Sequence, residues 1–188
     1  MVAGQPIFGD CKVGWGMTFN PTNTTLGIST PESEFLGRLY WGKGPDGSPR
    51  VFGIVKNVKG SALSARQLLK YDTTDNRFGL DVTLATADQG PPAGAVEEGY
   101  AGGVANGLWF RMVVYAPKMG LILQTTSDSR NTIACGGWIT CAADDGTFTG
   151  QDTVSLSAIQ NRVGRALRAT TNVTDAAAVV NCWVSILE

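Results

Sequence analysis

The last third of the chain most constrains the fold, because it contains two apolar segments with the pattern of strands. In residues 178–187 every second position is apolar, namely Val180, Cys182, Val184 and Ile186. Alternate side chains of a strand point to opposite faces, so these residues predict one face of a buried core. The segment 163–169 precedes it across a short polar stretch, and the two together predict an antiparallel hairpin.

The first of these segments alternates less cleanly. Val163 and Leu167 fall on one face, but Arg165 stands between them. Either that face is partly polar or the strand contains a bulge. Both alternatives remain open from the sequence.

The composition favours strands over helices. The chain has 24 glycines, nearly twice the usual share of about 7%, and 16% charged residues against a usual value of about 25%. Short apolar runs separated by glycine-rich turns predict an all-β fold, an antiparallel β-barrel or sandwich with an extended N-terminal arm. A length of 188 residues is typical of one domain.

The first residues differ from the rest, and we assign residues 1–35 to the extended arm and residues 36–188 to the β-barrel or sandwich domain. The arm has many Gly, Pro, Thr and Asn residues and no settled apolar period. Exposed aromatic side chains need a surface to cover them, which makes three aromatics of the arm candidate contacts to another protein: Phe8, Trp15 and Phe19. An irregular loop folded back on its own domain is the alternative.

Turn signals divide the domain into short strands. Pro45-Asp46-Gly47 predicts the turn of a hairpin between residues 39–41 and 51–55. Residues 78–84 alternate, with Phe78, Leu80, Val82 and Leu84 predicted to point inward.

The middle of the chain contains further turn signals. Asn106-Gly107 predicts a hairpin from a strand at 100–105 into one at 108–115. A turn is predicted at 117–120, and residues 86–99 are predicted to form a loop. Two candidate helices are short, Ser61–Leu69 and Ser155–Asn161, although 68–71 also suits a strand entered from a turn. Residues 133–142 predict a strand pair or a bent strand.

The charge, the apolar runs and the first residues argue against several classes of protein. A net charge of −1 argues against direct binding of nucleic acid. No apolar run approaches the ~20 residues that span a bilayer, so no membrane association is expected. The first six residues lack a secretory pattern, so synthesis in the cytoplasm is expected. The four cysteines are then expected to be thiols, with a Cys135–Cys141 bond as the alternative.

Groups that carry chemistry are scarce. The sequence has no histidine, the commonest general base and metal ligand, so we expect no enzyme, no metal and no cofactor. Glu97-Glu98 resembles a paired-carboxylate centre and Asp144-Asp145-Gly146 a cation loop, but solvated charge and a plain turn explain them more simply. Three arginines recur near the closing hairpin, either as partner contacts or as the wet edge of a strand: Arg162, Arg165 and Arg168.

The order of several glycine-bounded blocks carries a resemblance to a known family. The blocks are Gly60…Leu63…Gln67-Leu68-Leu69-Lys70-Tyr71-Asp72, Gly99 to Ala105, Gly137-Trp138-Ile139, Gly150-Gln151-Asp152 and Arg162 to Leu167. This succession, over about residues 55–188, resembles small decoration (cement) proteins of tailed bacteriophages. The resemblance implies a capsid-stabilising β-barrel on the virion surface, made in the host cytoplasm. It further implies binding to the major capsid protein and a homo-oligomer, with a trimer favoured.

Two other functions are compatible with the sequence. A carbohydrate-binding β-sandwich would use exposed tryptophans as stacking platforms, the candidates being Trp41, Trp109 and Trp138. For each of them the apolar neighbours favour an inward-facing side chain instead. A self-assembling shell or tail-tube subunit is the second alternative, and it would form particles or tubes on its own.

Overall fold

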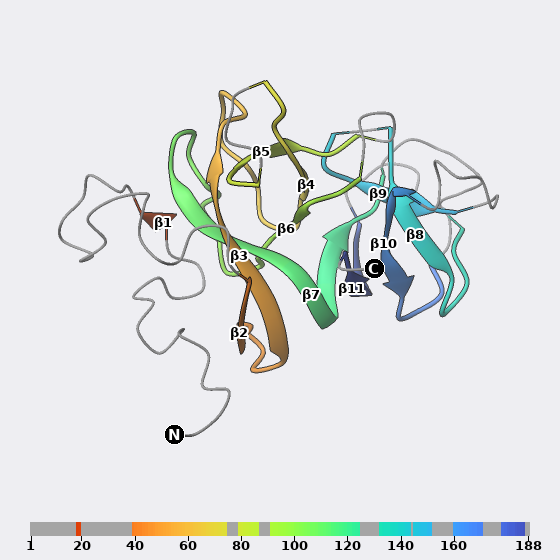
Figure 1. Cartoon of the computed structure of the whole chain (residues 1–188). Coiled ribbons are helices and arrows are strands. Elements are labelled where there is room, and N and C mark those ends of the chain that lie inside the picture. The colour runs from red at the N-terminus through yellow and green to blue at the C-terminus, as the bar shows by residue number, and fades with distance from the viewer. Residues whose placement is uncertain are drawn as a thin grey trace.

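The computed structural model describes residues 18–19, 39–74, 79–86, 91–124, 132–143, 145–151, 160–170 and 178–186. The elements in these ranges are strands, so the predicted all-β class is confirmed (Figure 1). They are β1 (Thr18–Phe19), β2 (Leu39–Lys43), β3 (Pro49–Asn57), β4 (Leu68–Tyr71), β5 (Asp81–Leu84), β6 (Gly94–Val96), β7 (Trp109–Ile122), β8 (Trp138–Cys141), β9 (Phe148–Gly150), β10 (Arg162–Ala166) and β11 (Val179–Ser185).

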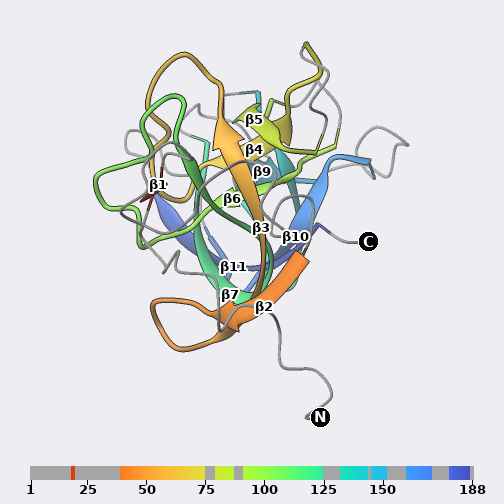
Figure 2. The ribbon, with the colours of Figure 1, turned by 60° about the vertical axis from the view of Figure 1, so that its left-hand side comes forward.

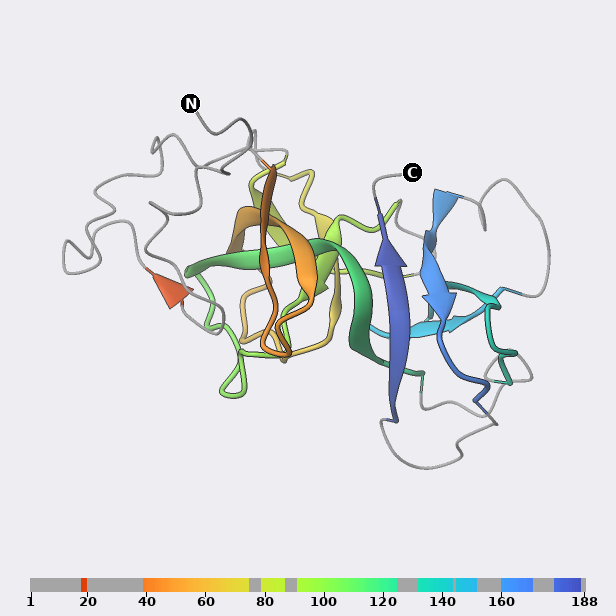
Figure 3. The same ribbon diagram turned by 90° about the horizontal axis from the view of Figure 1, so that it is seen from below.

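Five strands close into a small barrel. The sheet runs β2-β3-β5-β4-β6-β7-β11-β10-β8-β9, and β3 also pairs directly with β7. The path from β3 through β5, β4 and β6 to β7 therefore returns to its start. In Figure 3 these strands gather on one side of the molecule, and β8, β10 and β11 lie on the other.

The predicted hairpin around Pro45-Asp46-Gly47 is confirmed, because β2 and β3 pair antiparallel with Trp41 opposite Val51. β2 ends the sheet and lies at the end of the molecule away from β5 (Figure 2). The prediction of a wholly antiparallel sheet is wrong at one place. β3 pairs parallel with β5 at Lys56 and Asn57. The chain runs through β4 between these two strands, so it can enter β5 in the same direction as β3.

The C-terminal hairpin forms as predicted. β10 pairs antiparallel with β11, with Gly164 opposite Val184. Cys182 and Val184 are buried, and Val180 and Ile186 pack against the same core, whereas Val179 on the other face is exposed. The alternation of this segment therefore predicted its buried face correctly.

The long strand β7 belongs both to the barrel and to the C-terminal part of the sheet. It pairs with β3 and β6 in the barrel and with β11 beyond it. The turn predicted at 117–120 is wrong, because β7 continues through Pro117. Ala116 lies opposite Val184 and Met119 opposite Cys182, so β7 has one extra residue there. Such a bulge accommodates a proline, which has no N–H to donate.

Two cores explain why several strands do not alternate. One core takes residues from all five barrel strands and fills the barrel, including Val55, Leu69, Val82, Val96 and Met112. The other lies between the barrel and the C-terminal strands, including Leu68, Ala95, Val113, Ile139 and Val184. Neighbouring residues such as Leu68 and Leu69 therefore enter different cores. Because both faces of these strands are buried, their apolar runs are nearly continuous.

The loop predicted at 86–99 is wrong in part, because it contains the buried strand β6. Residues 100–105 form turns and one bridge from Val104 to Leu63 instead of a strand, so the turn at Asn106-Gly107 does not join a hairpin. Residues 61–69 contain no helix and enter β4 from a turn. Of the other candidate helix, residues 155–159 lie outside the described residues.

Residues 133–142 bend as predicted. A turn at Cys135 and Gly136 follows the bridge of Ile133 to Thr170 and precedes β8. In the inward set predicted for 78–84, Val82 and Leu84 are buried and Leu80 is half-buried, whereas Phe78 lies outside the described residues. Of residues 1–35 the structure describes β1, whose Thr18 and Phe19 pair with Phe110 and Trp109 of β7.

Candidate functional site

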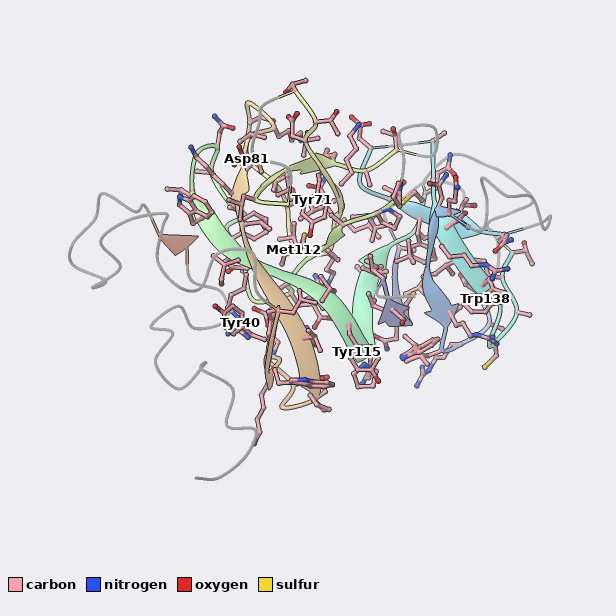
Figure 4. All side chains as sticks on the ribbon, viewed as in Figure 1. Tyr40, Tyr71, Asp81, Met112, Tyr115 and Trp138 are labelled. Carbon is pink, nitrogen blue, oxygen red and sulfur yellow. The ribbon has the colours of Figure 1, made fainter. Side chains whose placement is uncertain are left out.

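One outer face of the C-terminal strands brings together two arginines and two tryptophans. We call Trp138, Arg162, Arg165 and Trp183 the Trp–Arg face. Arg165 lies opposite Trp138 of β8 and opposite Trp183 of β11 in the strand register. Directly opposed residues point to the same side of a sheet, so one row crosses three strands on the side away from the core. Figure 4 labels Trp138 among the C-terminal strands.

A bulge in β10 places both arginines on this face. Residues three apart in a regular strand point to opposite faces. Arg162 lies opposite Thr140 but Gly164 lies opposite Ile139, so β10 gains one residue between them. Arg162 and Arg165 therefore share the outer face, while Val163 and Ala166 are both buried. Of the two alternatives that the sequence allowed, a partly polar face or a bulge, the bulge is confirmed. Leu167 follows the end of β10 and is exposed.

Only glycine fits at the bulge. Gly164 has a φ of 155°, and a Cβ there would lie 1.9 Å from the carbonyl oxygen of Trp183. This contact is impossible without separating β10 from β11. The close backbone approach therefore depends on Gly164, and the placement of the two arginines depends on the bulge.

Both guanidinium groups lie over the Trp138 indole. Arg165 Cζ is 3.9 Å and Arg162 Cζ is 4.3 Å from the ring centroid. Arg162 Nε also donates to Gln151 Oε1 at 2.8 Å, and Arg165 Nη1 donates to the Gly136 carbonyl at 3.4 Å. Cation–π attraction and these hydrogen bonds hold both groups in place. Trp138 and Gln151 were not predicted as partners of the arginines. Gly164 inside the strand was the available signal, because a glycine there indicates a bulge that changes which side chains share a face.

The other predicted contact residues are not brought to this face by the described structure. Arg168 is exposed just beyond β10. Phe8 and Trp15 lie outside the described residues, and only the backbone pairing of Phe19 with Trp109 is described.

A second exposed surface lies on the terminal strand of the sheet. We call Leu39, Trp41 and Tyr115 the β2 patch. Leu39 is 52% and Trp41 57% exposed, and the ring of Trp41 meets that of half-buried Tyr115 edge-on at 6.1 Å between centroids. Tyr40 between them is buried, so the alternation of β2 presents both large apolar side chains on its outer face.

The three tryptophans considered as sugar platforms differ in their surroundings. Trp109 is 1% exposed, so it offers no ring face to a sugar. Trp138 has two guanidinium groups over its ring, and Trp41 is the exposed member of the three.

The ion pairs of a buried arginine tie the β2–β3 turn to β7. Arg50 is 0% exposed, and its Nη2 lies 2.8 Å from Glu98 Oε2 and 3.3 Å from Asp46 Oδ1. Glu98 Oε1 accepts a hydrogen bond from the Gly120 amide at 2.6 Å. The prediction of solvated charge at Glu97-Glu98 is therefore wrong, because Glu97 is buried and Glu98 is the partner of Arg50.

Hydrogen bonds and burial shift several pKa values. The hydroxyl of Ser48 lowers the pKa of Asp46 at the turn. Burial raises the pKa of Cys141 and of Cys182 to about 12. Cys135, Cys141 and Cys182 are free thiols, so the alternative of a Cys135–Cys141 bond is wrong.

Within the described residues no three His, Cys, Asp or Glu side chains gather as a metal site. No helix in the same part of the chain is long and apolar enough to cross a membrane.

No protein-family model and no curated protein matches the sequence. Among solved structures, the chain is similar to the head fiber gp8.5 N base of bacteriophage phi29, with a TM-score of 0.46 and 18% sequence identity. The match covers 72% of this chain and 93% of that chain.

Proposed function

We propose that the chain is a structural protein of a bacteriophage virion, which binds the outer surface of the capsid and stabilises the shell. Its sequence blocks resemble those of decoration proteins, and its all-β domain presents two surfaces of the kind that bind proteins. The head fiber base is itself a phage protein, but a TM-score of 0.46 is too low to support the proposal.

The observation that carries the proposal is the β2 patch. Two large apolar side chains, more than half exposed, lie together on the last strand of the sheet. Tryptophan is enriched among the residues that dominate binding energy at protein interfaces. An apolar surface of this kind on an end strand is suited to a permanent contact with the major capsid protein.

The role is mechanical. An expanded head must resist the pressure of packed DNA, and a protein that bridges neighbouring capsomers adds contacts that must break before the shell ruptures. An interface of standard size buries about 1,600 Å². Many copies would multiply this contribution over the whole shell.

Sedimentation with expanded empty heads that lack this protein tests the proposal. We expect the chain to sediment with the heads and to raise their rupture temperature. Leu39→Ser is expected to weaken binding about tenfold or more, whereas Leu167→Ser, which removes an exposed leucine elsewhere, leaves it nearly unchanged. A wild-type chain that stays in the supernatant and leaves the rupture temperature unchanged would refute the capsid role.

The two alternative functions give different results. A glycan array with specific hits that are lost in Trp41→Ser would favour the carbohydrate-binding module. Electron microscopy of the protein alone would show particles or tubes if it were a shell or tail-tube subunit.

A further inference from the structure

We propose that the Trp–Arg face binds the carboxylate groups of an acidic segment on the partner protein. This inference rests on the proposed function and adds the chemistry of the capsid surface that would meet β8 and β10. It is carried by the placement of Arg162 and Arg165 and is independent of the β2 patch.

The arginines retain donors for an acceptor. A guanidinium has five N–H donors in a planar fork that fits both oxygens of a carboxylate. In the described part of the chain, the structure gives Arg162 one hydrogen bond, to Gln151, and Arg165 one, to Gly136. Each side chain is held on the indole, so less conformational freedom is lost when a ligand binds.

Within the described residues, neither charge has a carboxylate at ion-pair distance. The ion pairs among the described residues involve Arg50, and none involves Arg162 or Arg165. Both like charges lie close to one ring, and a carboxylate that accepts from them would offset their mutual repulsion. The arrangement also depends on Gly164, which alone permits the bulge, so the local backbone is specialised for bringing the arginines together.

Protein carboxylates fit this face better than nucleic acid does. A net charge of −1 provides no extended field for a phosphate backbone. Nucleic-acid bases bind single-strand proteins by stacking on exposed aromatic rings, and guanidinium groups already lie over the ring of Trp138. A short acidic segment needs only the two forks and the adjacent surface of Trp183.

A hexaglutamate peptide is a suitable probe at low ionic strength, followed by the NMR signals of the arginine Nε–H groups in the full chain. We expect the Arg162 and Arg165 signals to shift, and Arg165→Ala to weaken binding about tenfold or more. Arg168→Ala removes the same charge nearby without touching the indole, and is expected to weaken binding less than about threefold. Arg165→Lys keeps the charge but loses the fork, so it should behave more like Arg165→Ala.

The controls can overturn the proposal. Equal losses in Arg165→Ala and Arg168→Ala would show general attraction to net charge. Absence of binding to hexaglutamate, equal binding to hexaglutamine, or tighter binding to oligothymidine would also refute a carboxylate site.

Binding of the variants to expanded heads distinguishes a failure of this inference from a failure of the proposed capsid role. We expect Arg165→Ala to bind expanded heads about tenfold more weakly than wild type, with Arg168→Ala close to wild type and thermal unfolding unchanged in both. If wild type binds and Arg165→Ala binds equally well, the Trp–Arg face is not used and the capsid role stands. If wild type does not bind, the capsid role fails, and the peptide experiment decides the face on its own.

Discussion

Two arginines, each on a strand, differ in the role that their surroundings give them. Arg50 is wholly buried and paired with Glu98, so it holds the β2–β3 turn against β7. Arg165 is exposed and lies over Trp138 with no carboxylate within ion-pair distance in the described structure. Burial makes the first arginine structural, and exposure leaves the second available to a partner.

Breaking the buried pair should be costly. Glu98→Ala leaves the guanidinium of Arg50 in the interior without its closest carboxylate, and removes the acceptor of the Gly120 amide. We expect a loss of about 3 kcal/mol in the free energy of unfolding, measured by urea denaturation. Asp46→Ala, which removes the more distant and more exposed carboxylate, should cost less than about 1 kcal/mol. Equal losses in the two variants would contradict this assignment.

The reactivity of the cysteine thiols should depend on their burial. In a Cys11→Ser background, we expect Cys135 to react with a thiol reagent in the native protein near neutral pH, because it is exposed. Cys141 and Cys182 should react only after unfolding, since burial raises their pKa to about 12 and hides them from the reagent. For both groups the folded pKa is above the unfolded one. Their contribution to stability is therefore present below the unfolded pKa of about 9 and lost as the pH rises through 12.

At the scale of elements, bulges decide which residues share a face. In β10 the bulge buries both Val163 and Ala166, and in β7 another accommodates Pro117 and buries Ala116 and Met119. In each case residues three apart lie on one side of the sheet. Strict alternation cannot produce this arrangement, so both strands depart from the period of two that a regular strand shows.

Substitution at the first bulge tests this directly. Gly164→Ala places a Cβ against the Trp183 carbonyl oxygen, which forces β10 from β11 and should cost about 3 kcal/mol. Gly53→Ala is the matched control in β3, where the new Cβ would meet its nearest atom at an ordinary 3.7 Å. We expect the control to change stability by less than about 1 kcal/mol in thermal denaturation. A tolerated Gly164→Ala would show that the close approach is not required.

The sequence predicted those elements in which local pattern and tertiary packing agree. The alternation of 178–187 and the turn at Pro45-Asp46-Gly47 depend on nearby residues, and both were correct. β6 was missed because it has only three residues just after Pro91-Pro92, and tertiary pairing with β4 and β7 makes it a strand. Pro117 was misinterpreted as a turn because the bulge that accommodates it is defined by β11, which is distant in the sequence.

The candidate site was predicted in part for the same reason. The arginines were singled out by their recurrence, but their common face depends on the register of β10 with β8. Predicting the β2 patch would have required knowing that β2 is the end strand of the sheet, and no local sequence pattern contains that information.

In the molecule as a whole, the single strand β7 is shared by the barrel and by the C-terminal part of the sheet. β7 contributes Met112 to the barrel core and Leu121 to the core beneath the C-terminal strands, so neither half has a complete sheet without it. The β2 patch and the Trp–Arg face belong to opposite ends of the sheet order, one on β2 and the other on the β11-β10-β8 part. The proposed bridging of neighbours in a shell would use these two surfaces, which lie on separate parts of one sheet.

The oligomeric state remains a prediction, because the structure is of one chain. We expect light scattering to give a mass close to three times the 19.8 kDa of the chain, since closed cyclic oligomers fit lattice sites of their own symmetry. A monomer at all concentrations tested would contradict the trimer and would leave single-copy binding to the capsid as the form to test.

Electron cryomicroscopy of expanded heads mixed with the purified chain would show whether it binds the capsid surface. We predict added density on the outer surface of the shell, into which the barrel and the C-terminal strands fit with the β2 patch and Trp138 facing capsid protein. Heads without added density at saturating protein would refute the capsid role, and density in which both surfaces face solvent would refute their use as contacts.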